Sequence, residues 1–238
     1  MLFELKRACM QINGFNTQDH VLIIAEIGNN HEGDLGLAQK LIGLAAKAGA
    51  HAVKFQTIVP ERLVSPKETK RIEQLNRICL PLDAFSKLKQ TADDEGVLFM
   101  STPFDMESVA LLNPLVNAFK VASSDNDYEP LIETIASTGK PIILSSGLAN
   151  MSLIYKTTHC IEAAWAKAGI HADLAWLHCV SSYPVPDEEA NLLAIRHMKD
   201  ALKCTVGYSD HTLGIDAAVV AVALGARIIE KHFTIDKN

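Results

Sequence analysis

The chain has 238 residues, of which 22 are Lys or Arg and 28 are Asp or Glu, so its formal net charge is −6. Hydrophobic residues make up 48%, a fraction typical of folded globular proteins, which excludes an intrinsically disordered chain. The longest apolar run covers residues 217–224 and is far shorter than the ~20 residues that span a bilayer. We therefore expect no membrane segment. The negative net charge, without a block of Lys and Arg, also argues against nucleic acid or a membrane surface as the partner.

The 5 cysteines are odd in number, widely spaced and form no CxxC motif. This pattern fits neither a disulfide framework nor a structural zinc site. We expect free thiols in a reducing compartment, and hence a cytoplasmic protein.

In chain order, residues 1–18 predict a small hairpin extension with Asn13-Gly14 at its turn, which could close the bottom of the fold. Short apolar segments then alternate with helix-like ones. The predicted strands are residues 21–28, 51–56, 97–102, 118–123, 141–146, 174–180, 204–209 and 226–233. The predicted helices are residues 35–48, 82–95, 106–113, 129–137, 151–168, 190–198 and 215–224. The proline-containing residues 57–81 predict a long polar loop, whose length indicates a functional role.

Near-continuous apolar strands that alternate with helices predict an α/β fold with a parallel sheet buried on both faces. The number of strand–helix units favours a closed (β/α)8 TIM barrel, and no GxGxxG motif follows the first strand to support a Rossmann sheet. We interpret residues 1–238 as one barrel domain. Because the chain reaches Asn238 directly after the last strand, we expect the eighth helix to be missing and one flank of the barrel to lack its cover.

The active site of such a barrel lies at the C-terminal ends of its strands. Lys54 and Lys120 stand at two of these ends, together with Glu26, Gln56 and Glu230. Small hydroxyl residues stand at the others, namely Ser101, Thr102, Ser123, Ser145, Ser146, Ser181, Ser182 and Ser209. Each lysine alone could be a structural cation and each serine a turn former. Their convergence on one mouth favours a site for a phosphate or carboxylate anion.

Two histidines follow the last two strands: His211 after the seventh and His232 at the end of the eighth. Adjacent strands of a closed barrel would bring both imidazoles within reach of one ion, and such a pair suits Mn, Fe, Co or Zn. The alternative is a pair of hydrogen-bonded structural histidines. His178 and Cys179 are neighbours in sequence, but successive strand residues point to opposite faces, so we do not expect a nucleophile pair there.

Segments at every predicted strand resemble the sialic acid synthase family, which includes N-acetylneuraminate, legionaminic and pseudaminic acid synthases and the spore-coat polysaccharide synthase. The segments are AEIGNNHEGD (residues 25–34), VKFQT (53–57), STPFD (101–105), FKVASSD (119–125), ILSSG (143–147), HCVSSYP (178–184), GYSDHTLG (207–214) and IEKHFTID (229–236). Their order is that of the family over residues 20–238, so the resemblance is specific.

The resemblance implies condensation of phosphoenolpyruvate with the aldehyde of an N-acetylated amino-sugar, N-acetylmannosamine or a diacetamido hexose, to a nonulosonic acid with release of phosphate. It implies that phosphoenolpyruvate is held by Lys54, Thr102, Lys120, Ser123, Ser145 and Ser209. It implies that His211 and His232 bind a divalent metal, usually Mn²⁺, with Mg²⁺ or Co²⁺ as alternatives. Glu26 resembles the carboxylate at the reaction centre. Gln56, Tyr183 and Glu230 resemble contacts to the sugar or the metal.

The chain departs from the family pattern in three places. Family members continue into an eighth helix and an antifreeze-like C-terminal domain, which in dimers contributes an arginine to the partner's site; neither is in these 238 residues. Ser181 stands where the mannosamine-specific branch has an Asn that contacts the acetamido group, and residues 124–127 replace a GSGE- or ASFE-like segment. These differences leave the sugar open, and a homodimer remains an expectation.

Two other functions stay open from the residues. A buried lysine with a lowered pKa, Lys54 or Lys120, could form a Schiff base in an aldolase or lyase. A truncated, non-catalytic barrel that binds a sugar or phosphate is the second alternative.

Overall fold

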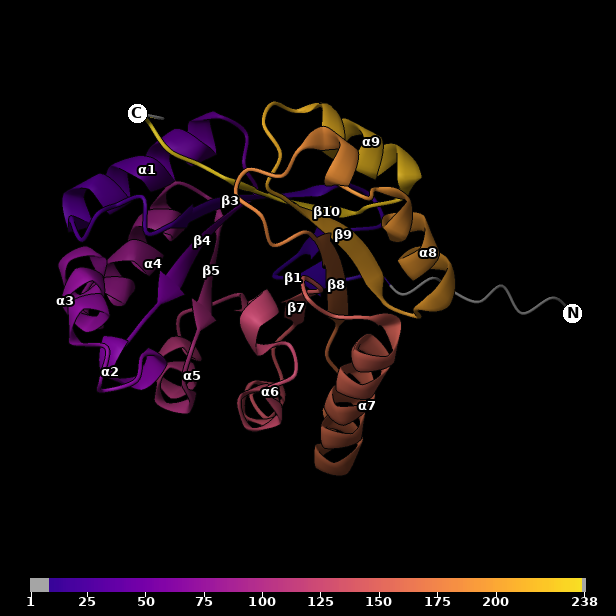
Figure 1. Ribbon diagram of the computed structural model, residues 1–238, viewed down its shortest axis with the longest axis horizontal. Coiled ribbons are helices and arrows are strands. Elements are labelled where there is room, and N and C mark those ends of the chain that lie inside the picture. Colours follow the sequence, from indigo (N-terminus) through magenta and orange to yellow (C-terminus); the bar gives the residue numbers. More distant parts are fainter. Residues whose placement is uncertain (1–8, 237–238) are drawn as a thin grey trace, which may run out of the picture.

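The computed structural model describes residues 9–236 and contains a closed barrel of 8 parallel strands in the order β10-β3-β4-β5-β6-β7-β8-β9 (Figure 1). The strands are β3 (Leu22–Gly28), β4 (Ala52–Thr57), β5 (Leu98–Pro103), β6 (Ala118–Val121), β7 (Ile142–Ser145), β8 (Leu174–Cys179), β9 (Thr205–Asp210) and β10 (Ile228–His232). The predicted TIM barrel is confirmed. Strands that follow one another in the sequence are neighbours in the barrel, and β10 closes it by pairing with β3.

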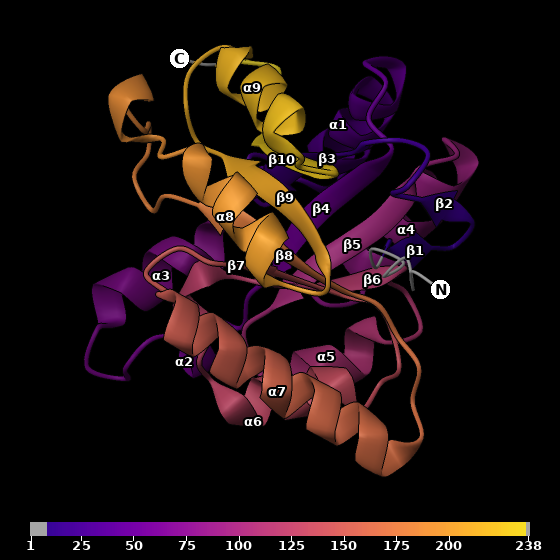
Figure 2. The same ribbon diagram turned by 90° about the vertical axis from the view of Figure 1, so that its right-hand side faces the viewer.

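Helices cover the outside of the barrel (Figures 1 and 2). They are α1 (Leu35–Lys47), α2 (Pro60–Leu63), α3 (Thr69–Ile78), α4 (Ala84–Asp94), α5 (Met106–Leu112), α6 (Glu129–Ala136), α7 (Met151–Ala168), α8 (Leu193–Ala201) and α9 (Asp216–Leu224). Several begin at a side-chain cap; for example, Asp34 Oδ1 accepts a 2.8 Å hydrogen bond from Leu37 N. Within residues 9–236, no helix combines the length and apolar character needed to cross a bilayer.

The segment 57–81 is not the long loop that its sequence predicts, because it contains α2 and α3. Pro60 lies in the first turn of α2, where the missing N–H costs nothing, so this proline begins a helix rather than breaking one. In α3 only Leu75 is buried. Its apolar residues Ile72, Leu75 and Ile78 recur at helical spacing, but all its other residues are polar, so the composition of the segment suggests a loop.

A hairpin closes the bottom of the barrel, as predicted, although residues 1–8 of the predicted extension lie outside the described part. Strands β1 (Gln11–Ile12) and β2 (Phe15–Asn16) pair across Asn13 and Gly14, both of which have positive φ (Figure 2). The side chains of Met10 and Ile12 are fully buried among the inward-pointing residues of the barrel. Met10 N donates a 2.9 Å hydrogen bond to Thr205 Oγ1 at the start of β9. The hairpin therefore acts as a plug.

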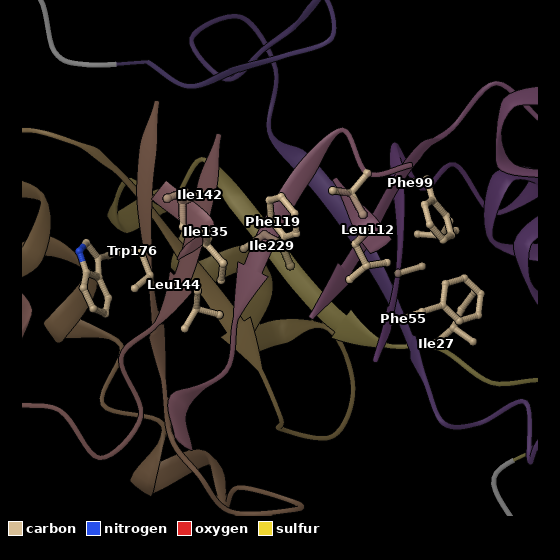
Figure 3. Close-up of a cluster of buried hydrophobic side chains, with 14 of the residues drawn as sticks. Ile27, Phe55, Phe99, Leu112, Phe119, Ile135, Ile142, Leu144, Trp176 and Ile229 are labelled. Atoms are coloured by element: carbon tan, nitrogen blue, oxygen red, sulfur yellow. The ribbon is translucent and has the colours of Figure 1, made fainter. Parts of the chain in front are cut away.

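The larger core lies between the outer face of the barrel and the helices. Figure 3 shows outward-pointing side chains of the strands, including Phe55, Phe99, Phe119 and Trp176, which belong to this core. Each is fully buried, and burial of one such side chain contributes roughly 1.5–3 kcal/mol. On β3, the outward residue Ile23 is 37% exposed, and no helix follows β10 within residues 9–236. Among the described residues, this part of the outer face of the barrel is partly open to solvent.

Candidate functional site

The inside of the barrel changes from apolar to polar between one inward-pointing residue of each strand and the next. In the lower half, the inward positions hold Ile24, Ala52, Met100, Ala118, Ile143 and Ile228, which form one buried cluster. Two residues further along each of these strands, the inward positions hold Glu26, Lys54, Thr102, Lys120, Ser145 and Glu230, all of which are buried. Strand alternation thus places charged groups directly above an apolar floor. The floor fixes the depth at which a ligand stops.

A cavity of about 380 Å³ opens above this floor at the C-terminal ends of the strands. It is lined by all the residues to which the family resemblance gives a role, and by Ser181: Glu26, Lys54, Gln56, Thr102, Lys120, Ser123, Ser145, Ser181, Tyr183, Ser209, His211, Glu230 and His232. The structure thereby brings these residues together, while their chemical roles stay predictions. Three of the strand-end serines do not line it. Ser101 bonds Thr57 Oγ1 at 2.7 Å, Ser182 donates to Pro184 O, and Ser146 is buried beside the cavity.

Two lysines and two carboxylates form a continuous charged cluster in the cavity. Lys54 Nζ lies 2.9 Å from Glu26 Oε2 and 3.5 Å from Glu230 Oε2. Lys120 Nζ lies 3.7 Å from Glu230 Oε1 and donates a 2.6 Å hydrogen bond to Ser145 Oγ. The carboxylate Oε2 atoms of Glu26 and Glu230 accept no well-aligned hydrogen bond from the described residues, so each keeps acceptor capacity for a ligand.

The four charged groups respond differently to burial. Burial would raise the pKa of Glu230, but the ammonium groups of Lys120 and Lys54 outweigh it and lower this pKa to about 2. Burial raises the pKa of Glu26 despite the opposing charge of Lys54. Burial disfavours the charged form of Lys54, but the carboxylates of Glu230 and Glu26 have the larger effect and raise the pKa of Lys54. At Lys120 burial has the larger effect, and the pKa of Lys120 is lowered. Glu230 is therefore a fixed negative charge, and Glu26 is the more basic carboxylate.

The orientation of Glu26 is set by its own loop. Gly28 has φ +53°, and a Cβ at this position would lie 3.0 Å from Glu26 Oε1, so a side chain here would be both strained and in close contact with the carboxylate. Gln56 donates from Nε2 to Glu26 Oε1 at 3.3 Å and accepts at Oε1 a 3.1 Å hydrogen bond from Asn29 Nδ2. The Asn29 contact fixes which end of the Gln56 amide faces the carboxylate.

The imidazoles of His211 and His232 face each other at the rim, with ring centroids 5.6 Å apart. His211 Nδ1 lies 2.8 Å from Val180 O and must be the donor there, which leaves Nε2 free to accept or to ligate. Burial, helped by the nearby Lys54 charge, lowers the pKa of His232 and favours the neutral imidazole. The ring of Tyr183 contacts both: it is tilted against His211 at a centroid distance of 4.1 Å and lies edge-to-face with His232 at 5.9 Å.

This donor set fits a divalent cation in part. Two imidazoles, of which at least one nitrogen is free, offer ligands of the type that Mn²⁺, Co²⁺ or Zn²⁺ accepts. Among residues 9–236 no cluster of three or more His, Cys, Asp or Glu side chains completes a ligand set. A cation here would rely on His211 and His232 and would keep its other positions for water or substrate oxygens, which is the pattern of a catalytic rather than a structural site.

Some residues of the cavity are missed by the sequence analysis. Cys179 points inward, with its Sγ 3.9 Å from His211 Nδ1 and 3.7 Å from Ser123 Oγ. Burial raises the pKa of this thiol, but the neighbouring His211 outweighs burial and the net pKa is lowered. His178 points outward and bonds Ala190 O at 2.8 Å, so the expectation that His178 and Cys179 do not face each other is confirmed. Phe104, Ala122, Ser124 and Leu148 also line the cavity.

Comparison with known proteins identifies the family. The model of the NeuB family matches residues 41–238. The chain belongs to the NeuB family. One relative of this chain is the N,N'-diacetyllegionaminic acid synthase of Campylobacter jejuni. The two are 43% identical over 231 residues, which cover 91% of this chain and 68% of the relative. The human N-acetylneuraminate-9-phosphate synthase is 32% identical over 235 residues, or 93% of this chain and 64% of the relative.

The barrel is also similar to solved structures of this kind. The N-acetylneuraminic acid (sialic acid) synthetase of Leptospira borgpetersenii, in complex with citrate, superimposes with a TM-score of 0.90 at 35% identity and covers 97% of this chain and 79% of that one. This NeuB-family chain spans between 61% and 69% of the length of the curated relatives it matches. The two relatives named above are sugar-acid synthases, so the chain carries the barrel of an enzyme family.

Proposed function

We propose that this barrel condenses phosphoenolpyruvate with the aldehyde of an N-acetylated hexosamine to give a nonulosonic acid and phosphate. One observation supports the proposal above the others. The buried pair Lys54 and Lys120 lies in the same cavity as the facing imidazoles of His211 and His232. A doubly charged phosphate ester and a reactive carbonyl could therefore be held side by side.

The lysines and hydroxyls would bind phosphoenolpyruvate. Lys54 and Lys120 would offset the negative charge of its phosphate and carboxylate, while Thr102, Ser145 and Ser209 supply neutral hydrogen bonds. Because Glu230 neutralises part of the lysine charge in the free site, its carboxylate keeps the buried ammonium groups from repelling each other before the ligand enters. Binding in this fixed geometry supplies orientation, which is a large part of catalysis for a two-substrate reaction.

The reaction joins carbon 3 of phosphoenolpyruvate to the aldehyde carbon, whose oxygen takes up a proton. Water then adds to carbon 2, and phosphate leaves with cleavage of the carbon–oxygen bond. Glu26 would stabilise positive charge at carbon 2 and accept the proton of the attacking water, since burial makes it the more basic carboxylate. His211 and His232 would hold the divalent cation, whose chemistry in such a site is polarisation of a carbonyl oxygen.

The sugar would occupy the outer part of the cavity, where Gln56, Ser181 and Tyr183 lie. Tyr183 is 68% exposed as a residue, and its ring would offer an apolar face to a sugar or an acetamido methyl group. Ser181 is a smaller hydrogen-bonding group than the Asn expected for a mannosamine-specific enzyme. We therefore include diacetamido hexoses beside N-acetylmannosamine as candidate substrates.

A Schiff-base aldolase is the second candidate, and the lowered pKa of the buried Lys120 favours it. Trapping of a Schiff base with borohydride distinguishes the two functions. Borohydride reduction in the presence of pyruvate would give a covalent adduct on Lys120 if the aldolase reading is right, and none if the condensation is right.

The proposal is tested by phosphate release from phosphoenolpyruvate with Mn²⁺ and each of three sugars, N-acetylmannosamine and two diacetamido hexoses. We expect release only when a sugar and the metal are both present, and loss of release in His232→Ala. The matched control is His197→Ala on the exposed side of α8, which should retain activity. Release without sugar, or release that is as fast with a chelator, would contradict the proposal.

A further inference from the structure

The backbone pairing between β9 and β10 ends just below the two imidazoles. The last paired residues are Asp210 and Lys231, and His211 and His232 each follow them by one position. Beyond this point, the described residues of β9 and β10 do not pair with each other. His232 pairs instead with Glu26 of β3, and His211 bonds Val180 O and Val185 N. Each imidazole is thus anchored on the side away from the other, so a direct link between the two strand ends has to come from side chains.

An ion pair stands at this last position. Strand alternation places it on the outer face of the barrel, because the preceding residues Ser209 and Glu230 point into the cavity. Lys231 Nζ lies 2.6 Å from Asp210 Oδ2, and the Asp210 side chain is 0% exposed. Inward and outward contacts alternate along the two strands. Ser209 bonds Glu230 at 2.9 Å inside the barrel, the ion pair follows outside, and the imidazoles face each other inside.

The same two side chains also fix the backbone on the far side of His211. Asp210 Oδ1 accepts hydrogen bonds from Thr212 N at 2.8 Å and from Thr212 Oγ1 at 2.7 Å. Lys231 Nζ donates a second hydrogen bond, to Thr212 O at 2.9 Å. His211 is thus held between two residues that are both tied to Lys231 on the neighbouring strand.

We infer that Asp210 and Lys231 are positioning residues that set the spacing of His211 and His232, and through it the affinity of the rim for a divalent cation. The inference rests on the proposed function of the two histidines as metal ligands. Without the ion pair, the ends of β9 and β10 lose their side-chain link beyond Ser209 and Glu230. Each imidazole then follows the neighbouring strand to which it is anchored, and the distance between the two is no longer fixed for one ion. Groups that orient metal ligands typically change metal affinity by 10- to 100-fold when they are removed.

The chain offers a close control in Asp105 at the start of α5. Asp105 accepts hydrogen bonds from Ser108 N at 2.9 Å and from Ser108 Oγ at 2.5 Å, and it pairs with Arg62 at 3.0 Å. Its partners are of the same kinds as those of Asp210, but they lie outside β9 and β10 and link neither His211 nor His232. A variant of Asp105 therefore shows the effect of losing such a carboxylate by itself, with the spacing of His211 and His232 unchanged.

The test is the dissociation constant of Mn²⁺ for the full chain, measured by electron paramagnetic resonance of the free ion, beside the melting temperature. We expect Lys231→Met and Asp210→Asn to bind Mn²⁺ roughly tenfold more weakly. Lys231→Arg should restore most of the affinity, because it keeps the charge, and Asp105→Asn should bind as the unchanged protein does.

Unchanged affinity in Lys231→Met, with binding abolished in His232→Ala, would overturn the inference and leave the metal site standing. Equal weakening in Asp105→Asn would overturn it as well. Absence of Mn²⁺ binding by the unchanged protein would overturn both the metal site and the inference. Because Lys231 is 30% exposed and Met keeps its length, Lys231→Met provides the test even if Asp210→Asn does not fold.

Discussion

Replacement of Lys54 by Met removes one cation from the buried charge cluster while it keeps the length of the side chain. Glu26 and Glu230 would then have only Lys120 to balance two carboxylates that are 3% and 5% exposed. Removal of one partner from a buried ion pair costs about 3–5 kcal/mol, because the other charge stays buried without compensation. A domain of this size loses roughly 2–4 °C of melting temperature per kcal/mol, so we expect a fall of about 6–20 °C.

The same substitution should weaken the binding of phosphoenolpyruvate. A hydrogen bond to a charged group contributes about 1.5–3 kcal/mol, which corresponds to a roughly 10- to 100-fold rise in the dissociation constant. Calorimetric titration with phosphoenolpyruvate and a thermal melt measure the two effects on one preparation. The exposed lysine Lys156 forms a 2.7 Å ion pair with Glu129 and provides the control.

In Lys156→Met we expect an essentially unchanged melting temperature and unchanged binding, because water screens that pair. Two results would refute the reasoning. If the Lys54→Met protein has the same melting temperature as the unchanged protein, the buried carboxylates do not require the lysine charge for stability. An unaltered affinity for phosphoenolpyruvate would mean that the anion binds elsewhere.

Three further changes probe the fold and the cavity. Gly207→Ala should destabilise the protein by about 1–3 kcal/mol, measured by urea unfolding, because the added methyl would lie 2.5 Å from the backbone oxygen of Ile228. Stability should fall as the pH falls below 6.5, because burial lowers the pKa of His31 and His178 and the unfolded chain then binds more protons. Iodoacetamide should modify Cys179, and phosphoenolpyruvate should slow that reaction, which mass spectrometry of the labelled peptide measures.

Each of these has its own control. Gly43→Ala on α1 should be neutral or stabilising, because its methyl meets only the flexible side chain of Glu95 at 3.1 Å. If Gly207→Ala lowers the free energy of unfolding no more than Gly43→Ala does, the close packing of β9 on β10 is contradicted. A stability that rises on acidification would contradict the histidine argument. Cys204 should resist alkylation, since burial raises its pKa to about 12; faster labelling at Cys204 than at Cys179 would contradict the assignment of Cys179 to the cavity.

The sequence predicts the barrel and the residues of its mouth for the same reason. Alternation along a strand, together with the rule that barrel sites lie at strand ends, is local information. It identifies Lys54 from its strand alone, without knowledge of any partner. The Asn13-Gly14 turn is local in the same sense, because both residues tolerate positive φ.

Other features depend on contacts between distant segments and could not be predicted this way. The neutralisation of both lysines by Glu230 needs three strands to meet at known heights. From the sequence, Cys179 can be compared only with its neighbour His178. In the structure Cys179 contacts His211, 32 residues away. Helix α3 is missed because the prolines and polar residues of 57–81 indicate a loop, and the short apolar spacing of Ile72, Leu75 and Ile78 does not outweigh them.

The most direct test of the account is anomalous diffraction from crystals grown with Mn²⁺ and phosphoenolpyruvate. The account predicts a manganese peak between His211 and His232, and the phosphate and carboxylate of the ligand against Lys54 and Lys120 in the same cavity. A manganese peak away from the two imidazoles, or a ligand bound outside the cavity, would contradict it.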